Sequence, residues 1–397
     1  MRRRPLLGAL AFGLPVAALA QARRACVATP AGAWPEWQAF RDDMVSDDGR
    51  VIDFNADATT TSEGQAYALF FALVAGDRAA FDRLLRWTED NLAAGDLGSR
   101  LPAWQWGRLE DGRWGVRDSN AASDADLWLA YTLAEAGRVW DSRRYRALGS
   151  VLARRIVVEE TLDLPGLGVS LLPGPRGFRL SERSARLNPS YLPLPLLRWF
   201  AANRPEPAWG PLLAASLNQL HATAPNGFAP DWVVYDADLG WLLDALPEAD
   251  RIGSYNAVRV YLWIGLTDPA DPARADLLAR YAPMARLVEQ LEGVPERVDP
   301  LLALAAQAAP DGMAARADRP AGFQAALLPF LDAAAAGAAT GRLAERVASQ
   351  PVQPRAYYNQ ALSLFALGFR ERRYGFAADG SLNLRWLTCD TSPGSSR

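Results

Sequence analysis

Two carboxylates at the starts of apolar helical segments are the strongest candidates for chemistry in this sequence. Short polar clusters containing Glu63 and Asp124 each precede an apolar run, and similar clusters contain Tyr191 and Asn256. The intervals are 61, 67 and 65 residues (63 to 124, 124 to 191 and 191 to 256), about the length of two helices and two connections. We therefore expect these four side chains to face one cleft, where the carboxylates can perform acid–base chemistry.

The elements that must position these residues are amphipathic helices. After Ser62, the apolar residues Tyr67, Phe70, Phe71 and Val74 have the spacing of one helix face, and residues 62–65 match a capping box. Similar patterns predict helices over 79–92, from 124 onward and over 145–158, with further starts near 191, 256, 322–323 and 357–359. Six inner and six outer helices predict an all-α fold, a closed (α/α)6 barrel.

Three longer inserts, 95–120, 161–188 and 226–253, separate these predicted helices and are rich in tryptophan, proline and glycine. Long loops on one rim of a rigid scaffold often carry binding residues. Aromatic rings stack on the apolar faces of sugar rings. Trp104 and Trp106 are accordingly the candidate sugar platforms, whereas most other tryptophans are expected to pack between helices.

Composition excludes several classes of chemistry. All 42 basic residues are arginine, so there is no lysine for a Schiff base or for a phosphate-binding loop. His221 is the sole histidine, so no histidine-based metal cluster is possible. We therefore expect carboxylate chemistry with no metal and no organic cofactor. Without the arginines of residues 1–22 the formal net charge falls from −3 to −6, which argues against nucleic acid as a partner.

The first residues are typical of an export signal. Three arginines at 2–4 precede an apolar run over 6–20 and the small-residue pattern Ala20-Gln21-Ala22. The sequence predicts a signal peptide over 1–22 and a single catalytic domain over 23–397, in a periplasmic or secreted protein without stable membrane insertion. In that compartment Cys26 and Cys389 are expected to form a disulfide, the alternative being two free thiols.

Three longer motifs carry a resemblance to a known family. Residues 60–65 (Thr-Thr-Ser-Glu-Gly-Gln), 122–126 (Ala-Ser-Asp-Ala-Asp) and 188–193 (Asn-Pro-Ser-Tyr-Leu-Pro) resemble glycoside hydrolase family 8, especially the periplasmic cellulases that accompany bacterial cellulose synthase. The resemblance extends over nearly the whole mature chain. It implies hydrolysis of β-1,4-glucan with inversion at the anomeric carbon, inside an (α/α)6 barrel. It also implies that the cellulose synthase complex is a partner, and we expect a monomer.

The same resemblance assigns roles to individual residues. Glu63 is implied as the general acid, and Asp124 lies beside the distorted sugar as a stabilising or water-positioning group. Tyr191 is implied to border the same subsite, and Tyr255 and Arg259 belong to a fourth family motif that contributes to substrate binding.

The chain departs from the family at the position of the general base. The family's cellulases usually carry the base aspartate in a Tyr-Asp-Ala-x-Arg motif, and residues 255–259 read Tyr-Asn-Ala-Val-Arg. Neutral Asn256 can hold a water molecule but does not readily accept a proton. Three explanations remain open: another carboxylate is the base, with Asp231, Asp238 and Asp250 as candidates; the enzyme is slow; or the protein binds glucan without cutting it.

Two further hypotheses follow from the residues alone. A non-catalytic saccharide-binding scaffold would use the same aromatic residues, and a polysaccharide lyase would need a base beside a uronate carboxylate.

Asp126 lies about 200° around the helix from Asp124, so both cannot face the cleft. We expect Asp126 to bind backbone amides or a neighbouring arginine.

Overall fold

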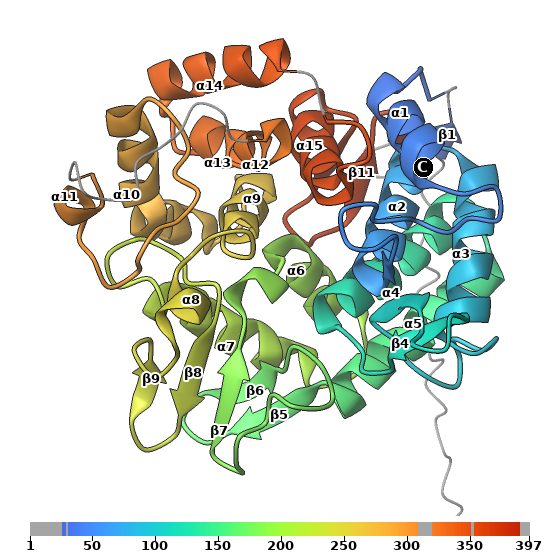
Figure 1. Ribbon diagram of the computed structural model, residues 1–397, viewed down its shortest axis with the longest axis horizontal. Helices are drawn as coiled ribbons and strands as arrows, with labels where there is room; N and C mark the ends of the chain where they lie inside the picture. Colours follow the sequence, from blue (N-terminus) through green and yellow to red (C-terminus); the bar gives the residue numbers. More distant parts are fainter. Residues whose placement is uncertain (1–25, 29–30, 309–319, 351–352, 390–397) are drawn as a thin grey trace, which may run out of the picture.

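The computed structural model describes residues 26–28, 31–308, 320–350 and 353–389. The predicted signal peptide therefore lies outside the described residues. Helices dominate the fold (Figure 1), and they are α1 (Pro35–Met44), α2 (Ser62–Val74), α3 (Arg78–Leu92), α4 (Ser123–Val139), α5 (Arg143–Glu159), α6 (Leu194–Asn203), α7 (Trp209–Ala222), α8 (Glu248–Arg251), α9 (Val258–Leu266), α10 (Arg274–Leu291), α11 (Leu304–Gln307), α12 (Ala321–Ala325), α13 (Leu328–Ala333), α14 (Gly337–Ser349) and α15 (Tyr357–Arg370). In the described part of the chain, no helix is long and apolar enough to cross a membrane.

The helices begin close to where the sequence predicts them. Helices α2, α4, α9 and α15 start within two residues of the predicted positions, and a 3₁₀ turn at Pro189–Tyr191 precedes α6. Nearly every side chain of α2, α4 and α9 is buried, whereas α3, α5 and α14 bury one face. In Figure 1 the first group lies toward the middle of the molecule and the second at its periphery. The helix-rich architecture is thus confirmed, with core helices covered by amphipathic ones.

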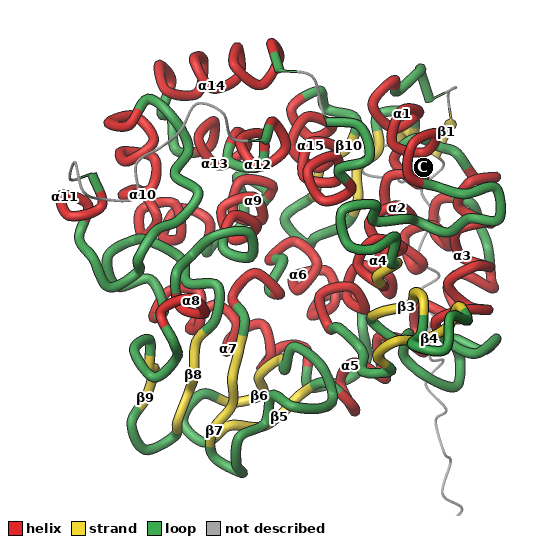
Figure 2. The backbone as a smooth tube through the Cα atoms, viewed as in Figure 1, coloured by secondary structure: helices red, strands yellow, loops and turns green. Residues whose placement is uncertain are grey.

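Short strands occur where the sequence suggested loops, so the fold is not purely helical. They are β1 (Cys26–Ala28), β2 (Thr60–Thr61), β3 (Gln105–Arg108), β4 (Trp114–Asp118), β5 (Thr161–Leu164), β6 (Gly168–Leu171), β7 (Ser184–Leu187), β8 (Val233–Asp236), β9 (Gly240–Leu242), β10 (Tyr374–Phe376), β11 (Leu382–Leu384) and β12 (Leu387–Cys389). All pairings are antiparallel, and β2-β3-β4 and β7-β8-β9 form three-stranded sheets. The three long inserts therefore contain antiparallel hairpins, which lie in the lower half of the view in Figure 2.

A buried glutamine fixes the start of α2, the helix that carries Glu63. The Gln65 side chain is fully buried, and its Nε2 donates to the Gly49 carbonyl at 3.1 Å and to Thr88 Oγ1 at 2.9 Å. Its Oε1 accepts a hydrogen bond from the Val51 amide at 2.6 Å. Because these partners lie on the preceding loop and on α3, the first turn of α2 has a single position relative to its neighbours.

A glycine permits the close approach of α12 and α15. A Cβ atom at Gly322 would lie 1.8 Å from the Asn359 carbonyl oxygen, so any larger residue would force the two helices apart. This close packing fixes the position of α15, whose first residue is Tyr357, beside α2.

The two ends of the described chain pair with each other. Strands β1 and β12 place Cys26 directly opposite Cys389 in antiparallel register. Residues opposite one another in such a pair have Cα atoms about 4.5–5.5 Å apart, within the range that a disulfide spans. The bridge therefore stays a prediction that the backbone permits. Mass spectrometry after alkylation without reductant should show no modified thiol, and two modified thiols would exclude the bridge.

Candidate active site

The first turns of α2 and α4 present the two candidate carboxylates. Thr61 caps α2 by accepting the Gly64 amide at 3.1 Å, and the Ser62 amide donates to the Trp104 carbonyl at 3.0 Å. On α4, Asp124 Oδ1 accepts the amide of the next residue at 2.8 Å. The Glu63 side chain retains 19% exposure, whereas the Asp124 side chain retains 4%. Glu63 is thus the more accessible of the two.

Arg259 joins these carboxylates through one nitrogen. Its Nη1 lies 2.5 Å from Glu63 Oε2, 2.8 Å from Asp124 Oδ2 and 3.0 Å from the Tyr67 hydroxyl. Its Nη2 donates to Ser190 Oγ at 3.1 Å and to Asn256 Oδ1 at 3.0 Å. Arg259 is only 3% exposed, so its guanidinium is occupied in holding the site residues together.

The environment of Glu63 suits an acid that must hold its proton near neutral pH. Burial raises the pKa of Glu63 to about 7; Asp124 also raises it, while Arg259 and a hydrogen bond from Tyr357 at 2.9 Å lower it. The start of a helix by itself favours the charged carboxylate. Desolvation therefore outweighs both the helix and the arginine, which is the arrangement that general-acid catalysis requires.

This pKa predicts the alkaline limb of the pH profile. A general acid acts in its protonated form, so kcat/KM should fall as pH rises through about 7, by about tenfold per pH unit beyond it. Initial rates on neutral cellopentaose from pH 5 to 9 measure this limb. A kcat/KM that stays constant to pH 9 would contradict the role of Glu63.

Asn256 contacts one of the three carboxylates considered as an alternative base. Its Nδ2 lies 3.5 Å from Asp231 Oδ2, while its Oδ1 already accepts hydrogen bonds from Asn188 Nδ2 at 3.3 Å and from Arg259. Asp231 Oδ1 accepts the amides of Ser254 and Ala257, each at 2.7 Å. Asp231 thus keeps Oδ2 beside Asn256, and burial raises its pKa despite those amides.

The other two base candidates lie in ion pairs with arginines. Asp238 is exposed beyond β8 and pairs with Arg183 at 2.6 Å, and Asp250 on α8 lies 3.3 Å from Arg186. In the described structure, neither carboxylate forms a hydrogen bond or an ion pair with Asn256 or Arg259. Of the three, Asp231 is the one that the structure brings to the site.

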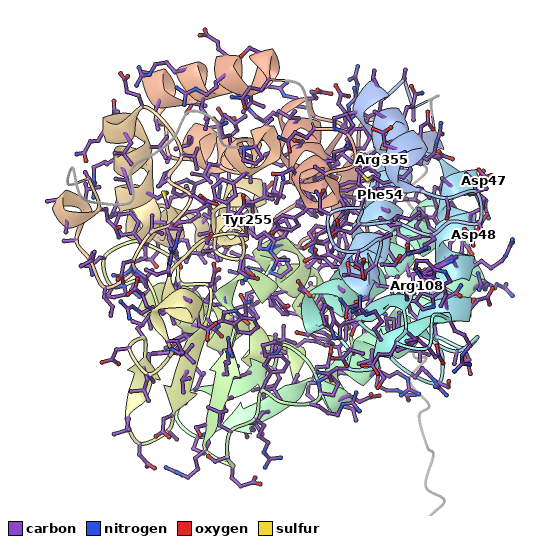
Figure 3. All side chains as sticks on the ribbon, viewed as in Figure 1. Asp47, Asp48, Phe54, Arg108, Tyr255 and Arg355 are labelled. Carbon is purple, nitrogen blue, oxygen red and sulfur yellow. The ribbon has the colours of Figure 1, made fainter. Side chains whose placement is uncertain are left out.

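The predicted aromatic residues form two groups, the tyrosines Tyr191 and Tyr255 and the tryptophans Trp104 and Trp106. The Tyr191 ring lies 5.6 Å from the Arg259 guanidinium carbon, so it borders the carboxylate cluster. Tyr255 is 36% exposed, and its ring contacts Tyr358, whose hydroxyl donates to the Tyr255 carbonyl at 2.6 Å. Figure 3 shows Tyr255 near the middle of this face, with Phe54 and Arg355 next to each other to one side.

The two candidate platforms lie on the strand segment next to α2. Trp104 is tied to the first turn of α2 through its carbonyl. The Trp106 ring stacks on Trp114 with centroids 5.2 Å apart and meets the edge of Trp87 on α3. The structure thus packs Trp106 between other rings, and the exposed ring of this cluster is Trp114, at 49%.

Two further site residues were not singled out as functional from sequence. Tyr357 donates to Glu63, and the Tyr67 hydroxyl contacts Arg259. Tyr67 lies one helical turn after Glu63, a spacing that places both on one side of α2. Tyr357 carries a weaker signal, because only its position at a predicted helix start links it to the site.

Asp126 does not bind the backbone amides or the arginine that the sequence suggested. Its carboxyl group faces that of Glu160, both residues are fully buried, and burial raises the pKa of each carboxyl well above its ordinary value. No other described group hydrogen-bonds to their carboxyl oxygens. Two carboxyl groups can form a hydrogen bond only if one is protonated, and the raised pKa of each favours a proton held between them.

This retained proton predicts a loss of stability with rising pH. The folded state binds a proton that the unfolded carboxyls release above about pH 4, so the free energy of unfolding should decrease as pH rises, by about 1.4 kcal/mol per pH unit for one proton. In Asp126→Asn the amide N–H can donate to an ionised Glu160 in place of the shared proton, so the decrease between pH 5 and 8 should be shallower. Urea unfolding at both pH values measures this. Parallel slopes for the variant and the wild type would contradict the shared proton.

Two carboxyl side chains that meet at one arginine on a helix-rich scaffold are the arrangement expected of a glycoside hydrolase. Comparisons with known proteins give the particular family. The family described as "Glycosyl hydrolases family 8" matches residues 15–372, and the chain belongs to that family.

Named relatives match over almost their full length. The endoglucanase of Escherichia coli O157:H7 is 46% identical over 354 residues, which cover 89% of this chain and 91% of that protein. The endoglucanase of Xanthomonas axonopodis pv. citri is 44% identical over 394 residues, which cover 98% of each chain. The crystal structure of endo-1,4-D-glucanase from Vibrio fischeri ES114 has a TM-score of 0.79 and 41% identity, covering 89% of this chain and 99% of that one.

Proposed function

We propose that this protein is an inverting endo-1,4-β-glucanase. The observation that carries the proposal is the pairing of Glu63, with a pKa raised to about 7, and Asp124 through a single Arg259 nitrogen. The endoglucanase relatives support the substrate class. The order of core and covering helices supports the closed (α/α)6 barrel expected from the sequence.

Glu63 supplies the acid half of the mechanism. It protonates the leaving glycosidic oxygen, and it starts protonated because burial outweighs Arg259 in setting its pKa. Asp124, held by the same guanidinium, stabilises positive charge that develops on the sugar ring at the anomeric carbon. Asp124 forms no covalent bond in an inverting reaction.

Asp231 supplies the base half. Its Oδ2 is the carboxylate oxygen beside Asn256, and the Asn256 carbonyl has both lone pairs engaged by Asn188 and Arg259. Asn256 therefore orients the attacking water through its amide N–H, and Asp231 accepts the proton of that water. A raised pKa makes Asp231 a stronger base than an ordinary aspartate.

The cellular setting is also part of the proposal. The sequence pattern of residues 1–22 supports export to the periplasm or beyond. The β-1,4-glucan chain is then the substrate, and the resemblance to cellulases that accompany bacterial cellulose synthase supports a role in cellulose biosynthesis, with the synthase complex as partner.

Reducing-end release from a panel of polysaccharides tests the substrate class. The purified mature protein should release reducing ends from carboxymethylcellulose in preference to xylan and chitosan. Viscosity should fall early in the reaction, because internal cleavage shortens chains faster than cleavage from an end. Absence of product together with retained cellopentaose binding would contradict this proposal. It would favour a glucan-binding protein without hydrolytic activity, the alternative raised by asparagine at position 256 in place of the expected base.

A further inference from the structure

An arginine-lined cavity of about 540 Å³ lies at the ends of α9 and α15 away from the active site. Helix α9 carries Arg259 in its first turn and ends at Leu266, and α15 begins at Tyr357 and ends at Arg370. With a rise of about 1.5 Å per residue, the cavity is about 10 Å from the site along α9 and about 20 Å along α15. It is therefore separate from the residues around Glu63.

The cavity is bounded by several elements that meet at these helix ends. Strand β10 packs beside α15 (Figure 2), and β10 pairs with β11. The charged residues of the described lining are Arg274, Arg370, Arg372, Arg385, Asp268 and Asp332. Four arginines against two aspartates leave an excess of positive charge.

Of the four arginines in the lining, Arg370 is the one that forms an ion pair with a carboxylate in the described structure. Arg370 Nε donates to Asp332 Oδ2 at 2.7 Å, so that pair is internally balanced. Within the ranges that the structure describes, no carboxylate forms an ion pair with Arg274, Arg372 or Arg385. Asp268 in the lining partly offsets the charge of Arg274, so Arg372 and Arg385 are the cations of the lining that lack a carboxylate partner in the described structure.

Arg274 gives the second, independent observation. It is half-buried, and its Nε atom is buried with no hydrogen-bond partner in the described structure. It is also the first residue of α10, where the helix dipole disfavours a cation, and α10 has no side-chain cap. Burial lowers the pKa of this guanidinium. The Nε atom itself is too buried for a ligand to reach, so an anion in the cavity would contact Arg274 through the terminal nitrogens of its guanidinium.

The remaining lining determines what kind of anion fits. Phe369, Tyr374 and Phe376 contribute aromatic surface, and Leu266 and Leu384 contribute aliphatic surface. The volume is that of sites for small organic ligands, about 300–1,000 Å³. We propose that this cavity binds a small organic anion, whose phosphate, sulfate or carboxylate group contacts Arg274, Arg372 and Arg385 while its apolar body packs on the aromatic side chains.

Isothermal titration calorimetry with phenyl phosphate tests this site on the mature protein. Inorganic phosphate and benzyl alcohol separate the contributions of the anion and of the ring. Phenyl phosphate should bind with one-to-one stoichiometry and more tightly than either fragment. No binding of phenyl phosphate, or equal affinity for benzyl alcohol, would overturn the proposal.

Variants locate the binding. Arg274→Gln should weaken phenyl phosphate binding by about tenfold or more, because one charge-assisted hydrogen bond is lost. Arg372→Gln and Arg385→Gln alter exposed residues and serve if Arg274→Gln does not fold. Arg154→Gln, on the exposed face of α5, is the matched control and should bind as the wild type does. Unchanged affinity in all three cavity variants would contradict this site, and hydrolysis of cellopentaose should be unaffected in each.

Discussion

Glu63→Gln is expected to lower kcat on cellopentaose by roughly 10²- to 10⁴-fold. Glutamine keeps the size of the side chain and can still accept the Tyr357 hydroxyl, but it has no acidic proton to donate to the leaving oxygen. Because the change removes the acid and not the surrounding aromatic residues, cellopentaose affinity should change much less than kcat.

The matched control for this prediction is Glu159→Gln. Glu159 is the last residue of α5 and pairs with Arg155 at 2.6 Å near the surface. Its loss should leave turnover unchanged. Single-turnover kinetics and calorimetric binding separate the two effects on Glu63→Gln. Wild-type turnover in Glu63→Gln would show that Glu63 is not the general acid.

Asp231→Asn is expected to cause a loss of similar size, roughly 10²- to 10⁴-fold in kcat. Asparagine Oδ1 can still accept the Ser254 and Ala257 amides, so the loop before α9 should keep its structure. The group lost is the proton acceptor Oδ2 beside Asn256. Asp238→Asn and Asp250→Asn are matched controls, because both carboxylates lie in ion pairs outside the cluster, and both should retain activity.

Azide distinguishes a lost base from a damaged loop. The azide ion is already a nucleophile and needs no base, so it should restore turnover of Asp231→Asn. The carbon–oxygen bond breaks as Glu63 protonates the leaving oxygen, and a carbon–nitrogen bond forms on the opposite face of the sugar. Failure of azide to restore turnover would assign Asp231 a structural role.

Asn256→Asp tests the slow-enzyme explanation directly. If Asp231 is the base, a second carboxylate at 256 should change turnover little in the wild-type background, and it should compensate for Asp231→Asn. A strong rise in turnover from Asn256→Asp alone would instead show that the natural chain lacks an efficient base.

Much of the scaffold could be predicted because its signals are local. Apolar periodicity places the start of α2 within one residue, but the predicted capping box does not form, because Thr61 caps the helix and Gln65 bonds to the preceding loop and α3. The interval between polar clusters correctly groups Glu63, Asp124, Tyr191 and Asn256 around Arg259. The strands of the inserts are not predicted because each is only three to five residues long, and because one pairing, of Ser184–Leu187 with Val233–Asp236, joins segments far apart in the sequence.

The electrostatic details depend on contacts that a single sequence does not specify. Asp126 meets Glu160, which comes from the far end of the next helix, and Arg259 lies 196 residues from Glu63. Nothing in the spacing of either residue indicates its partner. The packing of Trp106 between Trp87 and Trp114 has the same origin, since it depends on how β3 lies against α3.

The most direct measurement of the central claim is the anomeric configuration of the first product. Proton NMR of cellopentaose during hydrolysis by the wild-type protein resolves the α and β anomers before they interconvert. An acid at Glu63 and a water activated by Asp231 predict that the new reducing end forms as the α anomer. Initial formation of the β anomer, or no cleavage at all, would contradict the inverting mechanism proposed for this site.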